Sequence, residues 1–475
     1  MATVRFGTAR GRWVIAAAVL GSGVAFLDGS VVNVAIPTLR TAMHMDVAQV
    51  QWTLDGYLVT LTALLLLGGS LGDILGRRRV FVAGLIGFAA ASCVCGIAPN
   101  AITLIGARAV QGAAGAFLLP GSLAIISATF AQEDRSRAIG AWSGLAGATS
   151  AIGPFVGGFL IDAVSWRLIF FINVPLVAVA VAIALRHVPE TKDDEATTPD
   201  WVGAGFITLT LAAAAFALIE RGRTALPAGG IALGALVVFL AIERSSKHPM
   251  LPLGVFSSRQ FTGANLTTFV VYAALGGVFF LLVVQLQMRL GYSALAAGVA
   301  LTPVTLLMMA LSARAGALAQ RIGPRIPMSV GPLVAGAGVA LFARIQPGTT
   351  YAGTVLPAVI VFGIGLTITV APLTAAVLAA ADERHVGVAS GVNNAVSRLG
   401  GLIAVAALPA VAGIDTSHVG TLAHGFPRAM YICAAGCALG GVIAFLTVRK
   451  AAKVRVMTVA SHVYPCGDPC VSEAA

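Results

Sequence analysis

Long apolar segments separated by short polar loops follow one another along almost the whole chain. Each is long enough to cross a bilayer as an α-helix, which needs about 20 predominantly apolar residues. The segments occupy residues 13–36, 50–71, 80–98, 101–130, 138–161, 167–188, 201–219, 226–243, 261–287, 293–313, 326–344, 352–378, 386–412 and 427–448. The pattern therefore predicts an all-α polytopic membrane protein with fourteen transmembrane helices.

Composition excludes an ordinary soluble protein. Of the 475 residues, 58% are hydrophobic and 10% are charged, whereas soluble proteins carry about 25% charged residues. The net charge of +11 is distributed as short basic clusters between the apolar segments. Clusters in these positions suit the anionic headgroups of membrane lipid, so we expect lipid contacts and no nucleic-acid partner.

The basic residues also predict an orientation. Of the 30 Lys and Arg residues, two lie more than one helical turn inside a span, and 21 of the others fall in the two chain ends and in the loops and span ends on their side. The loops on the opposite side carry the remaining 7. Because Lys and Arg accumulate on the cytoplasmic side, we expect a multi-pass protein of the inner (plasma) membrane with both termini in the cytoplasm.

A loop motif occurs twice in the chain. The first copy follows span 2 and consists of Gly69, Gly72, Asp73, Gly76, Arg77 and Arg78. A weaker copy at residues 316–325 follows span 10, with Gln320 in place of the acid. Repetition of this kind indicates two related halves. The expected units are a six-helix half at 1–188, a cytoplasmic linker at 189–200, two inserted helices at 201–245, a second six-helix half at 246–448 and a cytoplasmic tail at 449–475.

Two acids lie more than one helical turn inside a predicted span. An acid at membrane depth costs about 2.5–3.5 kcal/mol on insertion scales and is usually functional. Asp28 is well inside span 1, and we interpret it as a proton-binding group, the alternative being a structural carboxyl bonded to Ser30 or Asn33. Asp55, near the end of span 2, is either a second proton site or an interfacial acid in an aromatic belt.

Two arginines lie more than one helical turn inside a predicted span. Arg108 in span 4 needs a carboxylate or carbonyl partner, so it is expected either to tune a buried acid such as Asp28 or to satisfy backbone carbonyls in helix packing. Arg398 in span 13 lies one turn from Asn394. The candidates for lining a cavity are Asn33, Gln111, Asn393, Asn394 and Arg398. For the three in span 13, the alternative is that they form interhelical hydrogen bonds.

Small residues mark span 5. Gly153 and Gly157 share one helix face and form a groove for a neighbouring helix, and Gly158 is adjacent. Pro154 removes a backbone hydrogen bond and favours a kink. The segment either supports transport or is only a site of tight packing.

Taken together, these strings resemble the fourteen-span drug:proton antiporter family of the major facilitator superfamily, the EmrB/QacA type. The resemblance rests on the loop motif and on segments 27–37, 108–115, 153–158 and 166–175. It implies alternating access, export of hydrophobic or amphipathic small molecules in exchange for protons, and no cofactor beyond the proton gradient. Asp28 would exchange the proton, Arg108 would tune it, and Asp73 with Arg77 would latch the cytoplasmic side.

The sequence departs from this pattern in its second half. Spans 9 to 14 contain no acid, which disfavours strongly cationic substrates. Uptake or facilitated transport of a metabolite on the same fold is an alternative, as is a polytopic membrane enzyme or sensor, although the chain has no phosphate-cradling loop and no H-E-x-x-H motif. The tail residues His462, Cys466 and Cys470 are too weak a pattern to predict a metal site.

Cysteine labelling tests the predicted topology. In a background without the six native cysteines, a cysteine at Lys192 or Gln320 should be protected from an impermeant thiol reagent in intact cells, because both loops are predicted to be cytoplasmic. A cysteine at Gly222 should be labelled, and it controls for reagent access. External labelling at position 192 would contradict the fourteen-span topology.

Overall fold

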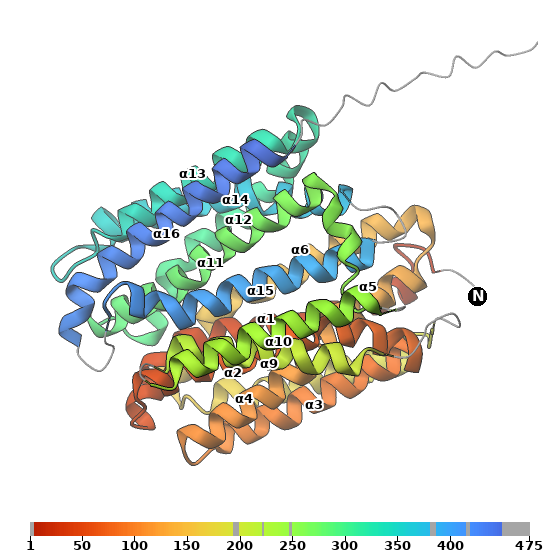
Figure 1. Cartoon of the computed structure of the whole chain (residues 1–475), viewed down its shortest axis with the longest axis horizontal. Coiled ribbons are helices and arrows are strands. Elements are labelled where there is room, and N and C mark those ends of the chain that lie inside the picture. Colours follow the sequence, from red (N-terminus) through yellow and green to blue (C-terminus); the bar gives the residue numbers. More distant parts are fainter. Residues whose placement is uncertain are drawn as a thin grey trace, which may run out of the picture.

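The protein is a bundle of long helices, seen along its shortest axis in Figure 1. The computed structural model describes residues 4–192, 199–220, 223–246, 249–380, 386–414 and 419–448. The tail after residue 448, with Cys466 and Cys470, and most of the linker at 193–198 lie outside these ranges. The α-helices are α1 (Ala9–Ala42), α2 (Val47–Leu75), α3 (Arg77–Ile97), α4 (Ala101–Gly115), α5 (Leu118–Thr129), α6 (Gln132–Ala163), α7 (Leu168–Phe171), α8 (Asn173–His187), α9 (Trp201–Ile219), α10 (Ala225–Ser245), α11 (Arg259–Met288), α12 (Ala294–Ile322), α13 (Arg325–Phe342), α14 (Leu356–Ala379), α15 (Val386–Val411) and α16 (Val419–Thr447).

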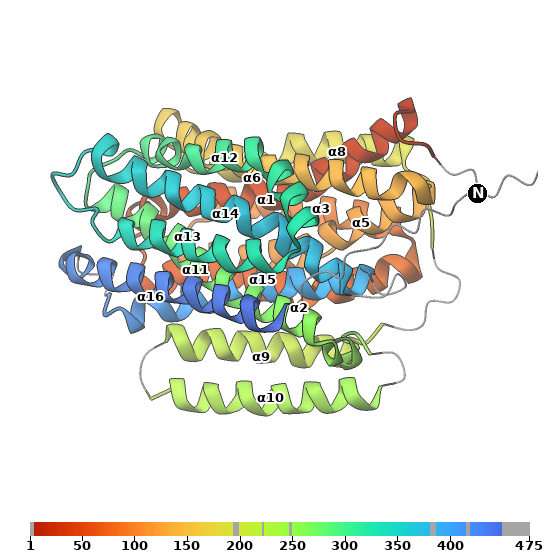
Figure 2. The same cartoon turned by 90° about the horizontal axis from the view of Figure 1, so that it is seen from above.

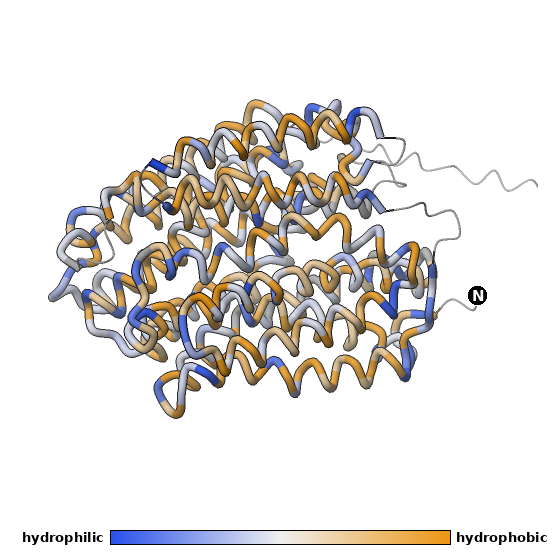
Figure 3. Tube along the Cα trace, turned by 60° about the horizontal axis from the view of Figure 1, so that its bottom comes forward, coloured by the Kyte–Doolittle hydropathy of each residue, from blue (hydrophilic) through white to orange (hydrophobic). Residues whose placement is uncertain are grey.

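These helices account for the fourteen predicted spans. Within the described ranges, 13 helices or helix pairs are long and apolar enough to cross a membrane. The pairs arise because α4 continues into α5 and α7 into α8 after short breaks. The fourteenth is α6, whose described apolar stretch is the shorter Ile152–Ala163. Hydrophobic positions cover the middle of the bundle and most hydrophilic ones gather at its two ends (Figure 3).

Polar caps fix where several helices begin. Asp46 accepts a hydrogen bond from the backbone N–H of Gln49, whose side chain in turn accepts from the N–H of Asp46. Asn100 and Ser293 cap α4 and α12 through their side-chain oxygens in the same way. Such caps satisfy N–H groups that the first helical turn leaves without a partner.

We divide the helices into an N-terminal group, α1–α8, and a C-terminal group, α11–α16. The hairpin of α9 and α10 forms a separate layer beside them (Figure 2). Helix α9 contacts α2 of one group and α15 of the other, while α10 packs on α9. The contact is apolar, and it includes Val59 on α2, Leu211 and Ala215 on α9, and Leu402 on α15. The hairpin therefore lies across the seam between the groups.

Small residues allow the two groups to approach closely where α6 meets α12. A Cβ atom on Gly158 would lie 2.4 Å from the Cα of Leu295. In the reverse direction, a Cβ on Gly298 would lie 2.3 Å from the backbone oxygen of Pro154. Both distances are too short for any side chain, so glycine is required on each helix.

Polar contacts join the groups at one end of the bundle. We call the end with the loop at residues 69–79 the motif end and the other the opposite end. At the opposite end, Gln51 of α2 donates to the carbonyls of Val405 and Ala406 in α15, at 2.7 and 3.1 Å. The side chain of Gln287 in α11 donates to the carbonyl of Val34 in α1 at 2.9 Å.

An acid on α6 completes this closure. Asp162, near the last residue of α6, accepts a hydrogen bond of 2.9 Å from the backbone N–H of Leu295 in the first turn of α12. A carboxylate at a helix N-terminus also interacts favourably with the helix dipole. The carboxylate of one group thus caps a helix of the other, and the structure has its two groups joined at the opposite end.

Removing this cap should loosen the opposite end. Asp162→Ala should shift the population by about two- to fivefold toward states open there, because an exposed carboxylate at a helix N-terminus contributes about 0.3–1 kcal/mol. Distances between spin labels at Val164 and Arg344, measured by double electron–electron resonance, report the change. Asp46→Ala is the matched control, since Asp46 caps a helix of its own group. Equal distance distributions for Asp162→Ala and Asp46→Ala would show that the cap does not hold the groups together.

Candidate functional site

A buried ion pair lies in the N-terminal group, between α1 and α4. The Nη1 of Arg108 is 2.5 Å from the Oδ2 of Asp28. The side chains are 1% and 0% exposed, so the pair has no contact with water. A charge buried in this way is tolerated only with a partner and further hydrogen bonds. The predicted association of Asp28 with Arg108 agrees with this geometry. Ser30, one of the two alternative partners, donates to the carbonyl of Leu27 instead.

The second oxygen of Asp28 is also satisfied. Its Oδ1 accepts from the amide nitrogen of Gln111 at 2.9 Å and from that of Asn173 at 3.0 Å. Gln111 lies one turn from Arg108 on α4, and its Oε1 accepts from the Arg108 guanidinium at 2.8 Å. Three donors from α4 and α8 therefore surround one carboxylate on α1.

Helix α2 holds the other side of the guanidinium. The Nε of Arg108 donates to the backbone oxygen of Thr53 at 3.3 Å. Its central carbon lies 4.2 Å from the centre of the Tyr57 ring, a cation–π arrangement. Arg108 thus has both a carboxylate and a carbonyl as partners, so the contacts expected under each interpretation of this residue are present.

Asn173 and Ser92 extend the network and were not predicted as site residues. Asn173 donates to Asp28 and to the hydroxyl of Ser92, which in turn donates to the backbone oxygen of Phe170 at 2.8 Å. Both side chains are fully buried. The signal in the sequence was an asparagine in an otherwise apolar stretch, but spacing alone does not show that span 6 meets span 1.

Asp55 has a different environment. It is fully buried on α2, and neither carboxyl oxygen has a hydrogen-bond partner within the described ranges. It is therefore not a solvent-exposed acid of an interfacial belt. The neighbouring Trp52 donates its indole N–H to Glu220, at the end of α9, at 3.3 Å.

The glycine segment of α6 packs against α1, the helix that carries Asp28. A Cβ on Gly153 would lie 1.8 Å from the hydroxyl of Ser30, and one on Gly157 would lie 2.7 Å from Val31. Gly158 faces α12 of the other group. The predicted groove is thus present, and the segment contacts both groups through adjacent residues.

The loop at the motif end is held in part by Glu190, an acid of the predicted linker. Asp73 accepts from Arg77 at 2.8 Å within the loop. Glu190, just after α8, accepts from the backbone N–H of Arg78 at 3.0 Å and is 3.7 Å from Arg79. A Cβ on Gly76, whose φ is +108°, would lie 2.7 Å from Glu190, so glycine serves both the backbone conformation and this contact. Gly69 and Gly72 make looser approaches.

The second copy of the motif repeats part of this geometry. Gly323, which corresponds to Gly76, also has a positive φ, +87°. Arg78 donates to the backbone oxygen of Val188 just after α8, and Arg325 donates to that of Phe445 near the end of α16. In both copies an arginine therefore binds the carboxyl end of its group's last helix.

The polar residues of α15 divide between two roles. Asn393 donates to the side-chain oxygens of Asn265 and Thr268 on α11, at 3.1 and 2.8 Å, which is interhelical hydrogen bonding within one group. Arg398 is half-buried and lies 5.4 Å from the ring of Phe26 on α1, across the seam. Asn33 and Asn394 are also half-buried, so neither residue is enclosed in the core.

A family profile of the Major Facilitator Superfamily matches residues 18–405. The chain belongs to the Major Facilitator Superfamily. It is therefore a multi-pass membrane transporter and not an enzyme, and transporters of this type need no cofactor. The match confirms the family and the fold class expected from the motifs.

Curated members of the superfamily resemble most of the chain. A methylenomycin A resistance protein of Streptomyces coelicolor is 32% identical over 94% of both chains. A methylenomycin A resistance protein of Bacillus subtilis is 34% identical, over 82% of this chain and 84% of its own. A puromycin resistance protein of Streptomyces alboniger is 32% identical over 92% of both.

Solved structures share the fold at low sequence identity. A bacterial homologue of the human lysosomal transporter Spinster, in an inward-facing and unoccupied conformation, matches with a TM-score of 0.68 and 16% identity over 93% of this chain and 97% of its own. An auto-inhibited peptide transporter of the POT family gives the same TM-score and identity, over 94% and 99%.

The effects of substituting Asp28 and Arg108 on the free energy of unfolding should be strongly coupled. Asp28→Asn leaves the Arg108 charge buried without an anion, and breaking a buried pair in this way costs about 3–5 kcal/mol. The double variant Asp28→Asn/Arg108→Gln removes both charges and should recover much of that loss. Unfolding of purified protein in detergent gives the free energies for a double-mutant cycle.

A neutral hydrogen bond supplies the control for this cycle. Ser122→Ala removes the buried contact of 2.8 Å between Ser22 and Ser122, and it should cost about 1 kcal/mol. Its effect should add to that of Arg108→Gln. If Asp28→Asn and Arg108→Gln were equally additive, the two side chains would not form an energetically coupled pair.

Proposed function

We propose that this protein is a proton-coupled exporter of hydrophobic or amphipathic small molecules such as antibiotics. The assignment of an exporter is supported by relatives that confer resistance to methylenomycin A and puromycin and that align over most of the chain. The assignment of proton coupling rests on one observation, the buried carboxylate of Asp28 surrounded by donors.

Protonation of Asp28 would change every contact in this cluster. The ionised carboxylate accepts hydrogen bonds from Arg108, Gln111 and Asn173, whereas a protonated carboxyl carries a donor and no charge. Arg108 would then lose its anion in a low-dielectric environment and would have to seek other acceptors, such as the carbonyl of Thr53. A proton entering at α1 is thereby coupled to the positions of α2, α4 and α8.

Asp55 is the second proton site of the proposal. A carboxyl group buried without a hydrogen-bond donor is costly, and Asp55 has no partner within the described ranges. It lies two residues from Thr53, whose carbonyl accepts from Arg108. Arg108 is therefore placed between the cluster around Asp28 and the backbone next to Asp55.

The two groups act as moving halves about a site near the bilayer midplane. The N-terminal half spans residues 1–188 and the C-terminal half 246–448, with the hairpin at 201–245 inserted between them. The motif end and both termini face the cytoplasm, across the inner (plasma) membrane. Substrate binds between the halves, where Arg398, Phe26 and Asn33 present half-buried side chains, and Asp73 with Arg77 belongs to the cytoplasmic gate.

Substrate range can be established in a host without its own efflux pumps. Expression of the protein should raise resistance to several amphipathic compounds in a broad panel that includes methylenomycin A and puromycin. Asp28→Asn, expressed at the same level, should lower that resistance to the background. Unchanged susceptibility across the whole panel would refute drug export.

Purified protein in proteoliposomes tests the coupling itself. Asp28→Asn should reduce substrate efflux under an imposed pH gradient at least about tenfold, because the titrating group has been removed. Exchange of labelled for unlabelled substrate without a gradient should stay within about twofold, since binding does not require the proton. Asp55→Asn should also reduce gradient-driven efflux while leaving exchange nearly unchanged, but the reduction in efflux should be smaller than for Asp28→Asn.

An exposed acid on the same helix as Asp55 provides the matched control. Asp46→Asn, at the N-terminus of α2, should leave gradient-driven efflux unchanged. Undiminished gradient-driven efflux by Asp28→Asn would remove Asp28 from the coupling mechanism. Loss of exchange together with efflux would assign Asp28 to substrate binding instead.

A further inference from the structure

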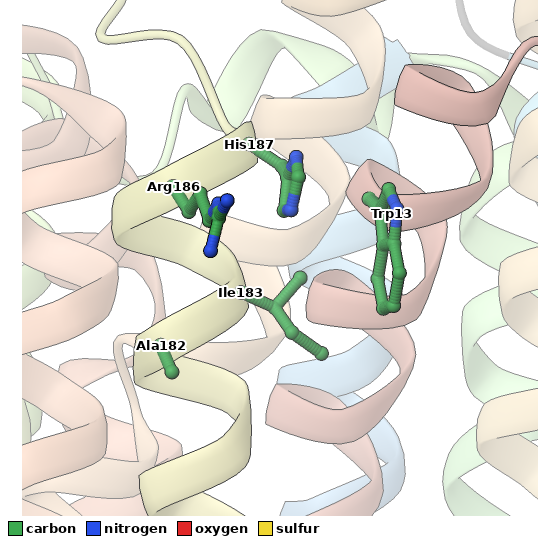
Figure 4. A pocket seen from close by; sticks show the side chains of 5 residues that line it. All are labelled: Trp13, Ala182, Ile183, Arg186 and His187. Carbon is green, nitrogen blue, oxygen red and sulfur yellow. The ribbon is translucent and has the colours of Figure 1, made fainter.

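An open cleft of about 420 Å³ lies between α1 and α8 at the motif end (Figure 4). Trp13 lines it from α1, and Ile183, Arg186 and His187 line it from α8. The cleft is more than 10 residues along α1 from Asp28 and shares no side chain with the ion-pair cluster. It is therefore a feature separate from the proposed transport site.

The walls of the cleft combine an aromatic ring with positive charge. The rings of Trp13 and His187 stack with their centres 5.1 Å apart and their planes at 10°. Arg186 is exposed, and within the described ranges its guanidinium has no ion pair or hydrogen bond. Arg10 lies one turn before Trp13 on the same face of α1. The described side chains that line the cleft include one cation, Arg186, and no acid.

An ordinary explanation covers part of this arrangement. Cations near a helix C-terminus interact favourably with the helix dipole, and Arg186 and His187 occupy the last turn of α8. The dipole does not explain why Trp13 is 45% exposed beside them, because an apolar ring gains nothing from water. A tryptophan at the end of an apolar helix is typical of the headgroup level of a bilayer.

Below Arg186 and His187, the same face of the protein is apolar. Ile183 lines the cleft one turn from His187, and Val179, one turn further along α8, is 51% exposed. A ligand that fits both parts must carry an anion at one end and hydrocarbon at the other. Basic pockets between transmembrane helices bind anionic lipid headgroups in this manner.

We propose that this cleft binds an anionic phospholipid, with its phosphate on Arg186 and His187, its glycerol region against Trp13 and an acyl chain along α8. The lipid would join the ends of α1 and α8, two helices that supply Asp28 and Asn173 to the buried cluster. Bound in this way, it stabilises the N-terminal group and does not require that the protein transport any particular substrate.

Lipid binding can be measured on the full chain in a zwitterionic detergent. Phosphatidylglycerol should raise the unfolding temperature and appear as a bound adduct in native mass spectrometry, and phosphatidylcholine should do so much less. Arg186→Ala/His187→Ala should weaken the phosphatidylglycerol interaction at least about fivefold, as expected for the loss of a cation near an anionic headgroup. Arg186→Lys should retain most of it.

The matched control is Arg344→Ala, which removes an exposed cation just beyond a helix C-terminus at the opposite end. It should leave phosphatidylglycerol binding unchanged. Inorganic phosphate at the same concentration should give no stabilisation, because it lacks the acyl chain. Equal stabilisation by phosphate would show an anion site rather than a lipid site and would overturn the proposal.

Tryptophan fluorescence locates the lipid without relying on stability. Phosphatidylglycerol brominated on its acyl chains near the headgroup should quench part of the emission, and that part should disappear in Trp13→Phe, which keeps an apolar ring. Brominated phosphatidylcholine should quench this component less. Quenching that is identical in the wild type and in Trp13→Phe, or lipid binding unaffected by Arg186→Ala/His187→Ala, would refute this cleft as the site.

Discussion

The N-terminal group is organised around a charge that the bilayer does not tolerate alone. The carboxylate of Asp28 is fully enclosed, and its enclosure is possible only because Arg108, Gln111 and Asn173 reach it from two other helices. This requirement fixes the rotation of α1, α4 and α8 about their axes, since each must direct one polar side chain to the same point. Apolar packing in lipid tolerates several rotations of a helix about its axis. The polar cluster therefore selects one rotation for each helix, which van der Waals contact alone would not do.

The contact between the groups follows a different rule. Where α6 meets α12, the helices approach so closely that glycine is required on both sides, and a polar contact between them is the hydrogen bond that Asp162 accepts from the backbone of Leu295. Joining and separating the groups there exposes no buried charge. Under the proposed alternating access, the ion pair would stay within the N-terminal group, while the contacts that part between α6 and α12 would be close glycine packing and the hydrogen bond to Asp162.

Much of this could be predicted from the sequence. Segment length and hydropathy predicted the helices, and the repeated loop motif predicted the family. Asp28 and Arg108 were found because single charges in apolar segments are conspicuous. Asn173 and Glu190 were missed because their roles depend on which helices are neighbours: an asparagine is neutral and common in interhelical packing, and an acid just after a span resembles linker composition. Asp55 was noticed, but the absence of a hydrogen-bond partner for it among the described residues could be learned only from three-dimensional packing.

The position of α9 has a mechanical consequence. Trp52 of α2 is hydrogen-bonded to Glu220 at the end of α9, whereas the contact of α9 with α15 is described by apolar side chains such as Leu402 and Ala406. Helix α9 is thus hydrogen-bonded to α2 in the N-terminal group and makes apolar contacts with α15 in the C-terminal group. In the proposed alternating access, α15 would slide along the apolar surface of α9 while α9 stays hydrogen-bonded to α2, and α9 would keep this seam covered from lipid.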